Sequence, residues 1–161
     1  MAHVSRLTGQ VRSLLQAQRV AALGTMAADG AALVSMVPFA IEPQRRCFVI
    51  HVSELAAHTG NLQATPRVSL MVMQSEVPGE PVHALPRVTF DGIASVPQRE
   101  SAPWVACRAA YLDRFPEAEM MTQLSDFKFV AIEVTGARQV AGFGSARSID
   151  AQEVQLALAP A

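Results

Sequence analysis

VSELAAHTGNLQATPRVSL, residues 52–70, predicts the end of a β-strand, a short polar helix and the start of the next strand. The helix is expected from Leu55 to Ala64. Thr65-Pro66 should end it, because a proline disfavours helical backbone at the residue before it. Hydroxyl, imidazole and amide side chains gather around this helix without the spacing of a metal site. They are Ser53, His58, Thr59 and Asn61.

This combination of side chains suits an anion, and we expect the phosphate of a cofactor. A helix N-terminus presents unpaired N–H groups and the positive end of the helix dipole, and hydroxyls and an imidazole add hydrogen bonds. Ser53 stands at the strand end, where a helix N-cap belongs, so its hydroxyl is expected both to cap the helix and to donate to the ligand. The alternative is that His58 and Thr59 are ordinary surface residues of a small helix.

Composition excludes several classes of protein. The chain has 161 residues, a hydrophobic content of 50 % and a formal net charge of −1, which does not match the basic surface of a nucleic-acid-binding domain. Cys47 and Cys107 lie far apart, so a disulfide scaffold is not expected. No stretch has the length of a membrane span, and residues 4–18 are amphipathic, unlike a signal peptide. We therefore expect a cytoplasmic protein without nucleic-acid or membrane partners.

The rest of the chain alternates between strands and turns. Ala28-Asp29-Gly30 separates two apolar runs and predicts a hairpin, and Pro38 in the return run predicts an edge, a bulge or an interrupted ladder. The expected strands cover 20–27, 31–41, 47–52, 67–73, 85–96 and 127–135, with a further one over 139–145 that Gly142 and Gly144 interrupt. The expected helices are an amphipathic one over 4–18 and one over 101–114, followed by a short helical turn over 117–124.

This order predicts a mainly β fold, an antiparallel barrel of six or seven strands with helices outside it. We expect a single domain over residues 1–150, including the N-terminal helix. The alanine-rich tail, residues 151–161, is expected to fray.

Three other positions are candidates for a ligand site. Ser35 shares its strand with Pro38, and an interrupted ladder would leave backbone groups free for a flat ligand. Arg87 requires an anion or an acceptor if it faces inward, whereas an outward Arg87 needs none. Gly142-Phe143-Gly144 lacks the context of a dinucleotide fingerprint and indicates a tight passage or a close approach to a ligand or partner.

No metal-ligand spacing, nucleophile elbow or phosphate-loop motif is present, so neither a metal nor a catalytic residue is predicted. Asp126, before an apolar strand, is expected to close a turn rather than to pair with a charge in the site.

Five segments together make the chain resemble the FMN-binding split-barrel proteins related to pyridoxamine 5′-phosphate oxidase, and more narrowly their haem-utilisation branch. The segments are residues 53–62, 65–70, 85–87, 126–127 and 140–146. The resemblance extends over roughly residues 21–147. It implies a split barrel that forms a homodimer, with two FMN sites at the interface between the subunits.

The resemblance also implies roles for individual residues. Ser53 would meet the phosphate of FMN, and His58 and Thr59 replace an Arg-Lys pair of the oxidases, which implies weaker and more pH-dependent FMN binding. Arg87 would lie near the flavin edge. The strand along the flavin ring would be Ser35, Met36, Val37 and Pro38, and the segment that approaches the partner's site would be Phe143 and Gly144.

These observations favour an FMN-binding oxidoreductase, although no acid or base of the protein identifies a reaction. The alternative is a haem-binding protein that uses the same interface cleft, for which His51, His58 and His83 are the internal imidazoles. No histidine follows His83, and the basic residues with which the oxidases hold their substrate have no counterpart here. A third hypothesis is a non-catalytic module that serves only protein contacts.

Overall fold

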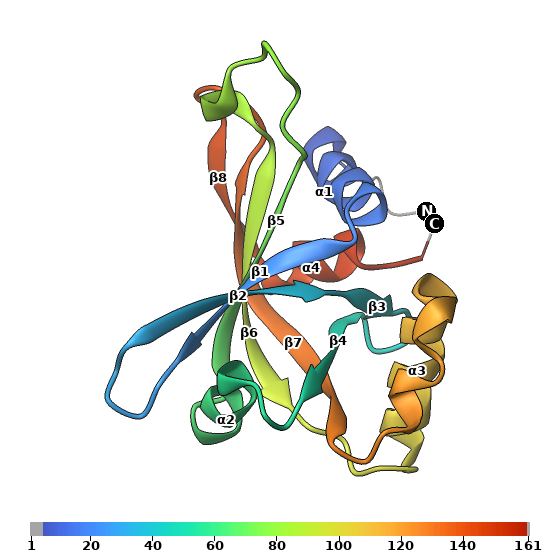
Figure 1. Ribbon diagram of the computed structural model, residues 1–161. Coiled ribbons are helices and arrows are strands. Elements are labelled where there is room, and N and C mark those ends of the chain that lie inside the picture. The colour runs from blue at the N-terminus through green and yellow to red at the C-terminus, as the bar shows by residue number, and fades with distance from the viewer. Residues whose placement is uncertain (1–4, 161) are drawn as a thin grey trace.

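A computed structural model describes residues 5–160 and shows an antiparallel half-barrel with flanking helices, which confirms the predicted fold class (Figure 1). The eight strands run in the order β2-β1-β5-β6-β7-β4-β3, and β8 pairs with β7. They are β1 (Val20–Met26), β2 (Ala32–Pro38), β3 (Ala40–Glu42), β4 (Cys47–Ser53), β5 (Arg67–Met73), β6 (Arg87–Ser95), β7 (Phe127–Val140) and β8 (Ala146–Asp150). The helices are α1 (Arg6–Ala17), α2 (Ala57–Ala64), α3 (Ala102–Arg114) and α4 (Ala151–Ala157). Within residues 5–160, no helix has the length and apolar character needed to cross a membrane.

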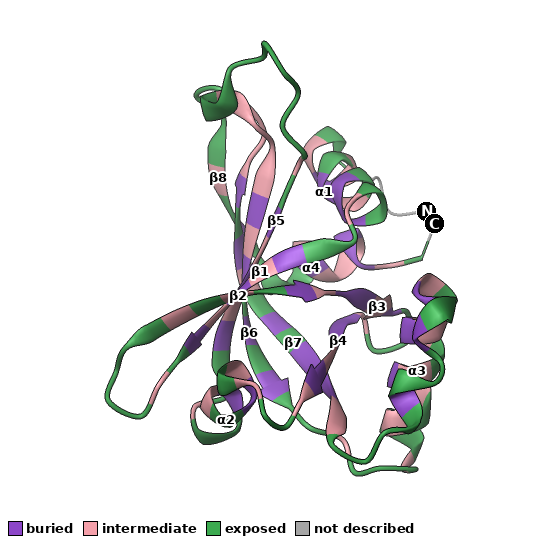
Figure 2. Cartoon of the chain, viewed as in Figure 1, coloured by how far each residue is buried: buried purple, intermediate pink, exposed green. Residues whose placement is uncertain are grey.

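The core fills the barrel, and α1 packs against it. Phe39, Phe48 and Phe90 are fully buried and pack edge to face, with ring centroids 5.5 and 4.8 Å apart along the series. The apolar stripe of α1 buries Leu14 and Leu15 against the same cluster, as its amphipathic pattern predicts. Figure 2 shows this burial running along the strands at the centre of the molecule.

The hairpin and the break after it form where the sequence predicts them. Gly30 has φ +86°, a left-handed conformation that a glycine adopts without strain. The ladder of β2 ends at Pro38 and β3 begins at Ala40, and between them the Phe39 N–H donates to the carbonyl of Arg19. This break turns one expected strand into two and leaves β2 at the edge of the sheet.

Several predicted boundaries are wrong. Residues 127–140 form one continuous strand instead of two, because β7 pairs with β6 and β4 on its two sides and with β8 near its end. The segment after α3 forms two short 3₁₀ turns, Pro116–Ala118 and Met121–Gln123, rather than a helical turn over 117–124. The predicted N-terminal helix begins at Arg6, and Val4 lies outside the described residues.

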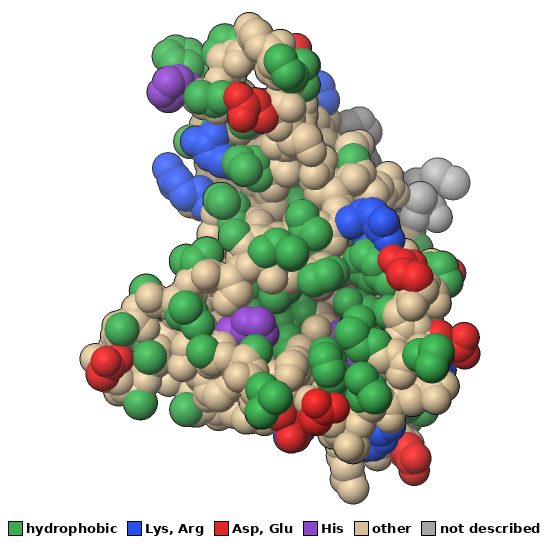
Figure 3. Space-filling model, in the orientation of Figure 1, with side chains coloured by type: hydrophobic (Ala, Val, Ile, Leu, Met, Phe, Trp, Pro, Cys, Tyr) green, Lys and Arg blue, Asp and Glu red, His purple; other side chains and the backbone are tan. Residues whose placement is uncertain are grey.

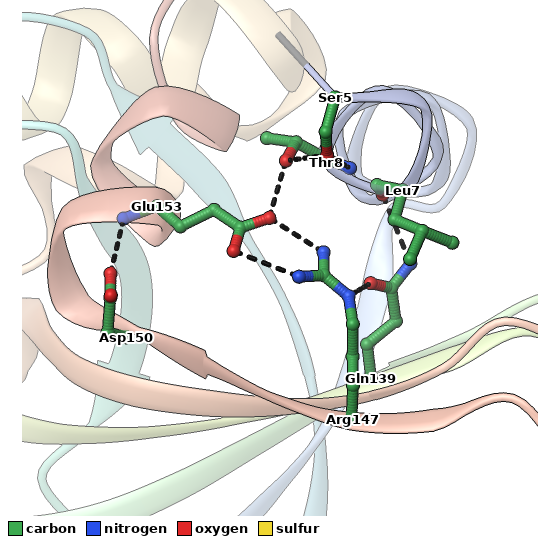
Figure 4. A network of polar contacts seen from close by, with 7 residues as sticks. All are labelled: Ser5, Leu7, Thr8, Gln139, Arg147, Asp150 and Glu153. Atoms are coloured by element: carbon green, nitrogen blue, oxygen red, sulfur yellow. Dashed lines mark hydrogen bonds and ion pairs between the residues drawn. The ribbon is translucent and has the colours of Figure 1, made fainter.

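The C-terminal segment, predicted to fray, forms α4 and buries Val154 completely in the main core. Polar contacts hold it in place (Figure 4). Glu153 accepts two hydrogen bonds from the Arg147 guanidinium, at 2.9 and 2.7 Å, and another from the Thr8 hydroxyl of α1. Arg147 Nε donates to Gln139 Oε1, and the Gln139 amide in turn donates to the backbone of α1. The network therefore joins α1, β7, β8 and α4.

Replacing Glu153 tests how much this network stabilises the fold. The hydrogen bonds from Arg147, and then from Thr8, lower the pKa of Glu153 below its usual value of 4.5. A carboxylate whose pKa is lower in the folded protein than in the unfolded protein stabilises the fold at pH values above its unfolded-state pKa. This stabilisation is lost as the pH falls through the folded-state pKa. We expect E153Q to lower the free energy of unfolding by about 1–3 kcal/mol at pH 7.

The expected deficit of E153Q shrinks as the pH is lowered from about 5 towards 3 in urea denaturation. E80Q, at an exposed loop position, is the matched control and should match the wild type at both ends of this range. An E153Q deficit that stays constant with pH would show that the carboxylate charge is not what holds α4.

Candidate functional site

The polar segment after β4 folds α2 onto the β1–β2 hairpin, and two side-chain hydrogen bonds join the helix to these strands. His58 Nδ1 lies 3.1 Å from the Ser35 hydroxyl on β2. Asn61 Nδ2 donates to the Thr25 hydroxyl on β1 at 3.1 Å. Two of the predicted ligand-binding residues, Ser35 and His58, are thus brought into direct contact from different elements. Asn61 anchors the helix, and its amide nitrogen is engaged within the protein.

Ser53 does not cap α2, which corrects the sequence prediction. The N-cap position is Ala56, and no side chain bonds to the first N–H groups of the helix. The strand continues to Ser53 and a turn intervenes before the helix, so the Ser53 hydroxyl accepts from the Leu55 N–H at 3.2 Å instead. The hydroxyl can still donate its own proton. The Thr59 N–H donates to the carbonyl of Ala56 at 3.0 Å, which leaves the N–H groups of Ala57 and His58 to solvent or to a ligand.

Thr59 has a structural role in this turn. Its side chain is 1 % exposed, and its hydroxyl donates to the carbonyl of Ser53 at 2.6 Å. That bond fixes the turn between β4 and α2 and uses the only proton that the hydroxyl has to give. Of the predicted phosphate donors, Ser53 and His58 therefore remain accessible and Thr59 does not.

The site carries little positive charge. Burial lowers the pKa of His58 below its usual value of 6.5, so its imidazole is neutral at pH 7. Lys128, which faces this turn from β7, is paired with Glu54 at 2.7 Å, and the two charges offset each other. Within the described chain no arginine or lysine is hydrogen-bonded to Ser35, Ser53 or His58.

Beside these polar groups, the edge strand β2 exposes apolar side chains. Val34 and Met36 are 70 % and 67 % exposed, whereas Val37 points into the core with 3 % exposure. Val37 can therefore offer a ligand only its backbone, while Pro38 is half-buried. Figure 3 shows hydrophobic side chains covering much of the middle of the molecular face that is drawn. Because side chains alternate along a strand, Val34 and Met36 lie on one face of β2, and Ser35 with His58 lies on the other. We call this edge segment, with Val34, Met36 and the Ser35–His58 pair, the β2 shelf.

Three predicted residues lie at the other end of the sheet. Arg87 begins β6 opposite Val140, is half-buried, and donates from Nη1 to the carbonyl of Leu85 at 2.9 Å. Phe143 is 88 % exposed at the tip of the β7–β8 hairpin, where Gly144 has φ +75°. Figure 1 shows this hairpin and α2 at opposite ends of the molecule. One chain therefore does not bring Arg87, Phe143 and Gly144 to the β2 shelf.

His51, one of the three internal imidazoles named for the haem alternative but not among the residues predicted to hold FMN, lies near this turn. It lies on the same face of β4 as Ser53 and packs among Phe127, Phe129 and Tyr111, with ring centroids 5.2, 4.5 and 5.6 Å away. Its Nδ1 is buried without a partner. Burial, and secondarily the charge of Arg99, lowers its pKa to about 4. The period of two along the strand, which aligns residues 51 and 53, was the signal that could have identified it.

The larger cavities of the described chain lie elsewhere. One of about 660 Å³ lies among α1, α3 and the C-terminal segment, and one of about 580 Å³ lies between α1 and the ends of β5, β6 and β7. Ser35, Ser53 and His58 line neither of them. Val34 borders a third hollow, of about 530 Å³, together with residues of β1, β5 and β6, whereas Ser35 and His58 do not line it. No group of three metal-ligating side chains gathers anywhere in residues 5–160.

Comparison with known proteins agrees with this architecture. The family model described as pyridoxamine 5′-phosphate oxidase matches residues 7–141. Heme oxygenase HutZ of Vibrio cholerae is 31 % identical over 150 residues, which cover 92 % of this chain and 84 % of that protein. The non-canonical chloroplastic heme oxygenase HOZ of Arabidopsis thaliana is 32 % identical over 140 residues, covering 85 % of this chain but only 41 % of its own length.

A solved structure of a heme-binding protein from Mycobacterium smegmatis superposes with a TM-score of 0.84 at 27 % identity. The match covers 94 % of this chain and 61 % of that one, so the Mycobacterium protein is considerably longer. The chain therefore belongs to the pyridoxamine 5′-phosphate oxidase-related split-barrel family, in its haem-utilisation branch.

Proposed function

We propose that this protein binds haem on the β2 shelf, and that a second copy of the chain completes the site. The observation that carries the proposal is that the edge strand β2 exposes Val34 and Met36 on one face, while Ser35 on its other face holds a neutral imidazole, His58. A haem presents a large apolar ring and an iron that accepts a histidine nitrogen. These residues fit that combination of chemistry.

His58 has the arrangement of an iron-binding histidine. A metal-ligating imidazole usually uses its other ring nitrogen in a hydrogen bond that fixes the ring. The contact of Nδ1 with the Ser35 hydroxyl plays that part here and leaves Nε2 for the iron. The hydroxyl of Ser53 and the free N–H groups at the start of α2 are donors for a propionate. When bound, haem would supply the redox chemistry, and these residues would bind and orient it.

Two further observations support the proposal. The Vibrio and Arabidopsis relatives are both named heme oxygenases, and the Vibrio protein matches over most of its own length. Oxidative breakdown of haem is therefore the activity to test. Within one chain, moreover, the exposed Phe143 hairpin and the β2 shelf each present apolar surface that nothing covers. A two-fold symmetric dimer would cover both, because each copy offers one of each surface.

FMN is the second candidate ligand. It is favoured by the uncapped N-terminus of α2 next to the free hydroxyl proton of Ser53, a pair of donors suited to a phosphate. Against it stands the absence of a bonded arginine or lysine in the described part of this site, since phosphate recognition commonly relies on a fixed cation. We therefore place FMN after haem.

Haemin titration tests the main proposal. The wild type should develop a Soret band of a histidine-ligated haem and bind haemin at least tenfold more tightly than FMN. H58A should lose the histidine-ligated spectrum, while H83A, on an exposed 3₁₀ turn, is the matched control. A wild-type protein whose spectrum does not change on addition of haemin would eliminate the proposal. If H58A kept the histidine-ligated spectrum of the wild type, a residue other than His58 would bind the haem iron.

FMN affinity should depend on pH through His58. Because its pKa is lowered by burial in the free protein, a bound phosphate can only raise it, so binding takes up a proton. We expect FMN, followed by quenching of its fluorescence, to bind several-fold more tightly at pH 5.5 than at pH 8. H58Q should remove most of this dependence. If the FMN affinities of the wild type and of H58Q changed equally with pH, His58 would not face the phosphate.

A charge on the β2 shelf should separate the proposed dimer. M36D places a carboxylate where the proposed interface is apolar, and burying it unpaired would cost several kcal/mol. Sedimentation should show the wild type as a dimer and M36D as a monomer with weakened haemin binding. M120D, at a methionine that is 82 % exposed outside the shelf, should remain dimeric. A dimeric M36D would place the interface on another surface.

A further inference from the structure

The cavity of about 580 Å³ beside α1 is not explained by haem or FMN binding on the β2 shelf. It lies between α1 and the ends of β5, β6 and β7, and its volume falls in the range of small-molecule sites. None of Ser35, Met36, Ser53 or His58 borders it. Within one chain it is therefore separate from the β2 shelf, and of the predicted ligand-binding residues only Arg87 borders it.

Its lining combines an apolar wall with cations. The wall consists of aliphatic side chains from α1, β6 and β7, among them Val11, Leu14 and Val88, all fully or almost fully buried. Arg6 and Arg87 border the cavity, and no aspartate or glutamate of residues 5–160 lines it. Such an excess of positive charge over an apolar surface suits a ligand with one anionic group and an apolar body.

Gly9 supplies a second, independent indication. Glycine inside a helix costs about 1 kcal/mol relative to alanine, because it loses more backbone freedom on folding. Gly9 lies within α1 and lines this cavity, yet a Cβ built on it would meet no atom within 4 Å. Packing against the protein therefore does not require a glycine here. The missing side chain widens the cavity.

The framework around the cavity is fixed. The Gln139 side chain is 2 % exposed and bonds at both ends, donating to the carbonyl of Leu7 and accepting from Arg147. Arg87 is held by the carbonyl of Leu85 through Nη1. A site whose lining is already ordered loses less entropy on binding than one that must be organised by its ligand.

We propose that this cavity binds a small organic monoanion, an aromatic or short-chain carboxylate, with its apolar body against α1 and its carboxylate near Arg6 and Arg87. Arginine recognises carboxylates through paired N–H donors, and the aliphatic wall buries the rest of the molecule. This binding does not depend on haem, and it can be measured on the protein without any cofactor.

The test uses 1-anilinonaphthalene-8-sulfonate, a fluorescent aromatic anion, with benzoate and hexanoate as competitors. The wild type should bind the probe, and both carboxylates should displace it. G9F fills the cavity and should weaken probe binding at least tenfold. G9A is the matched control, because it adds one methyl group to open space and should bind as the wild type does while melting at a slightly higher temperature.

The charge requirement is tested separately with R6Q and with N-phenyl-1-naphthylamine, the uncharged analogue of the probe. R6Q should weaken the sulfonate several-fold and leave the uncharged analogue unaffected, which also keeps the proposal testable if G9F fails to fold by circular dichroism. A folded G9F that binds the probe like G9A would overturn the proposal. So would carboxylates that do not compete, or an R6Q protein that binds the sulfonate with wild-type affinity.

Discussion

The burial of Phe39 at the break between β2 and β3 is the constraint on which the rest of the molecule depends. Its ring is fully buried against Phe48, which in turn packs on Phe90, so the chain must turn inward at this point. The turn carries β3 to its place beside β4 and leaves β2 at the edge of the sheet. The half-barrel is closed in this way, and the outer face of β2 is left uncovered.

The position of the proposed binding surface follows from this closure. With β2 at the edge, α2 has the β1–β2 hairpin beneath it, and His58 reaches Ser35 from an element that is otherwise distant in sequence. The polar groups that gather there are neutral, because burial keeps a proton off His58 and Lys128 is paired with Glu54. Neutral polar groups on an edge strand that also exposes apolar side chains favour a large apolar ligand over a compact dianion.

Local patterns in the sequence were sufficient for the hairpin at Gly30, the break at Pro38 and the existence of α2, since each depends on the backbone preferences of one or two residues. The missing cap at Ser53 and the burial of Thr59 could not be predicted, because the turn at Glu54 and Leu55 decides which side chain meets the helix. The order of α4 was missed for a different reason. It depends on Arg147 and Thr8, whose contacts with Glu153 join distant parts of the chain.

The separation of Phe143 from the β2 shelf bears on how the proposed cofactor site would be completed. Phe143 is 88 % exposed at the tip of a hairpin, where an aromatic ring gains nothing from the protein that carries it. The shelf exposes Val34 and Met36 to a similar degree at the other end of the sheet. Two such surfaces on one rigid chain cannot cover each other, whereas a two-fold axis pairs each with its counterpart and closes the assembly. A dimer of this kind would hold two equivalent sites, each built from both chains, so that loss of the dimer and loss of the ligand would be linked.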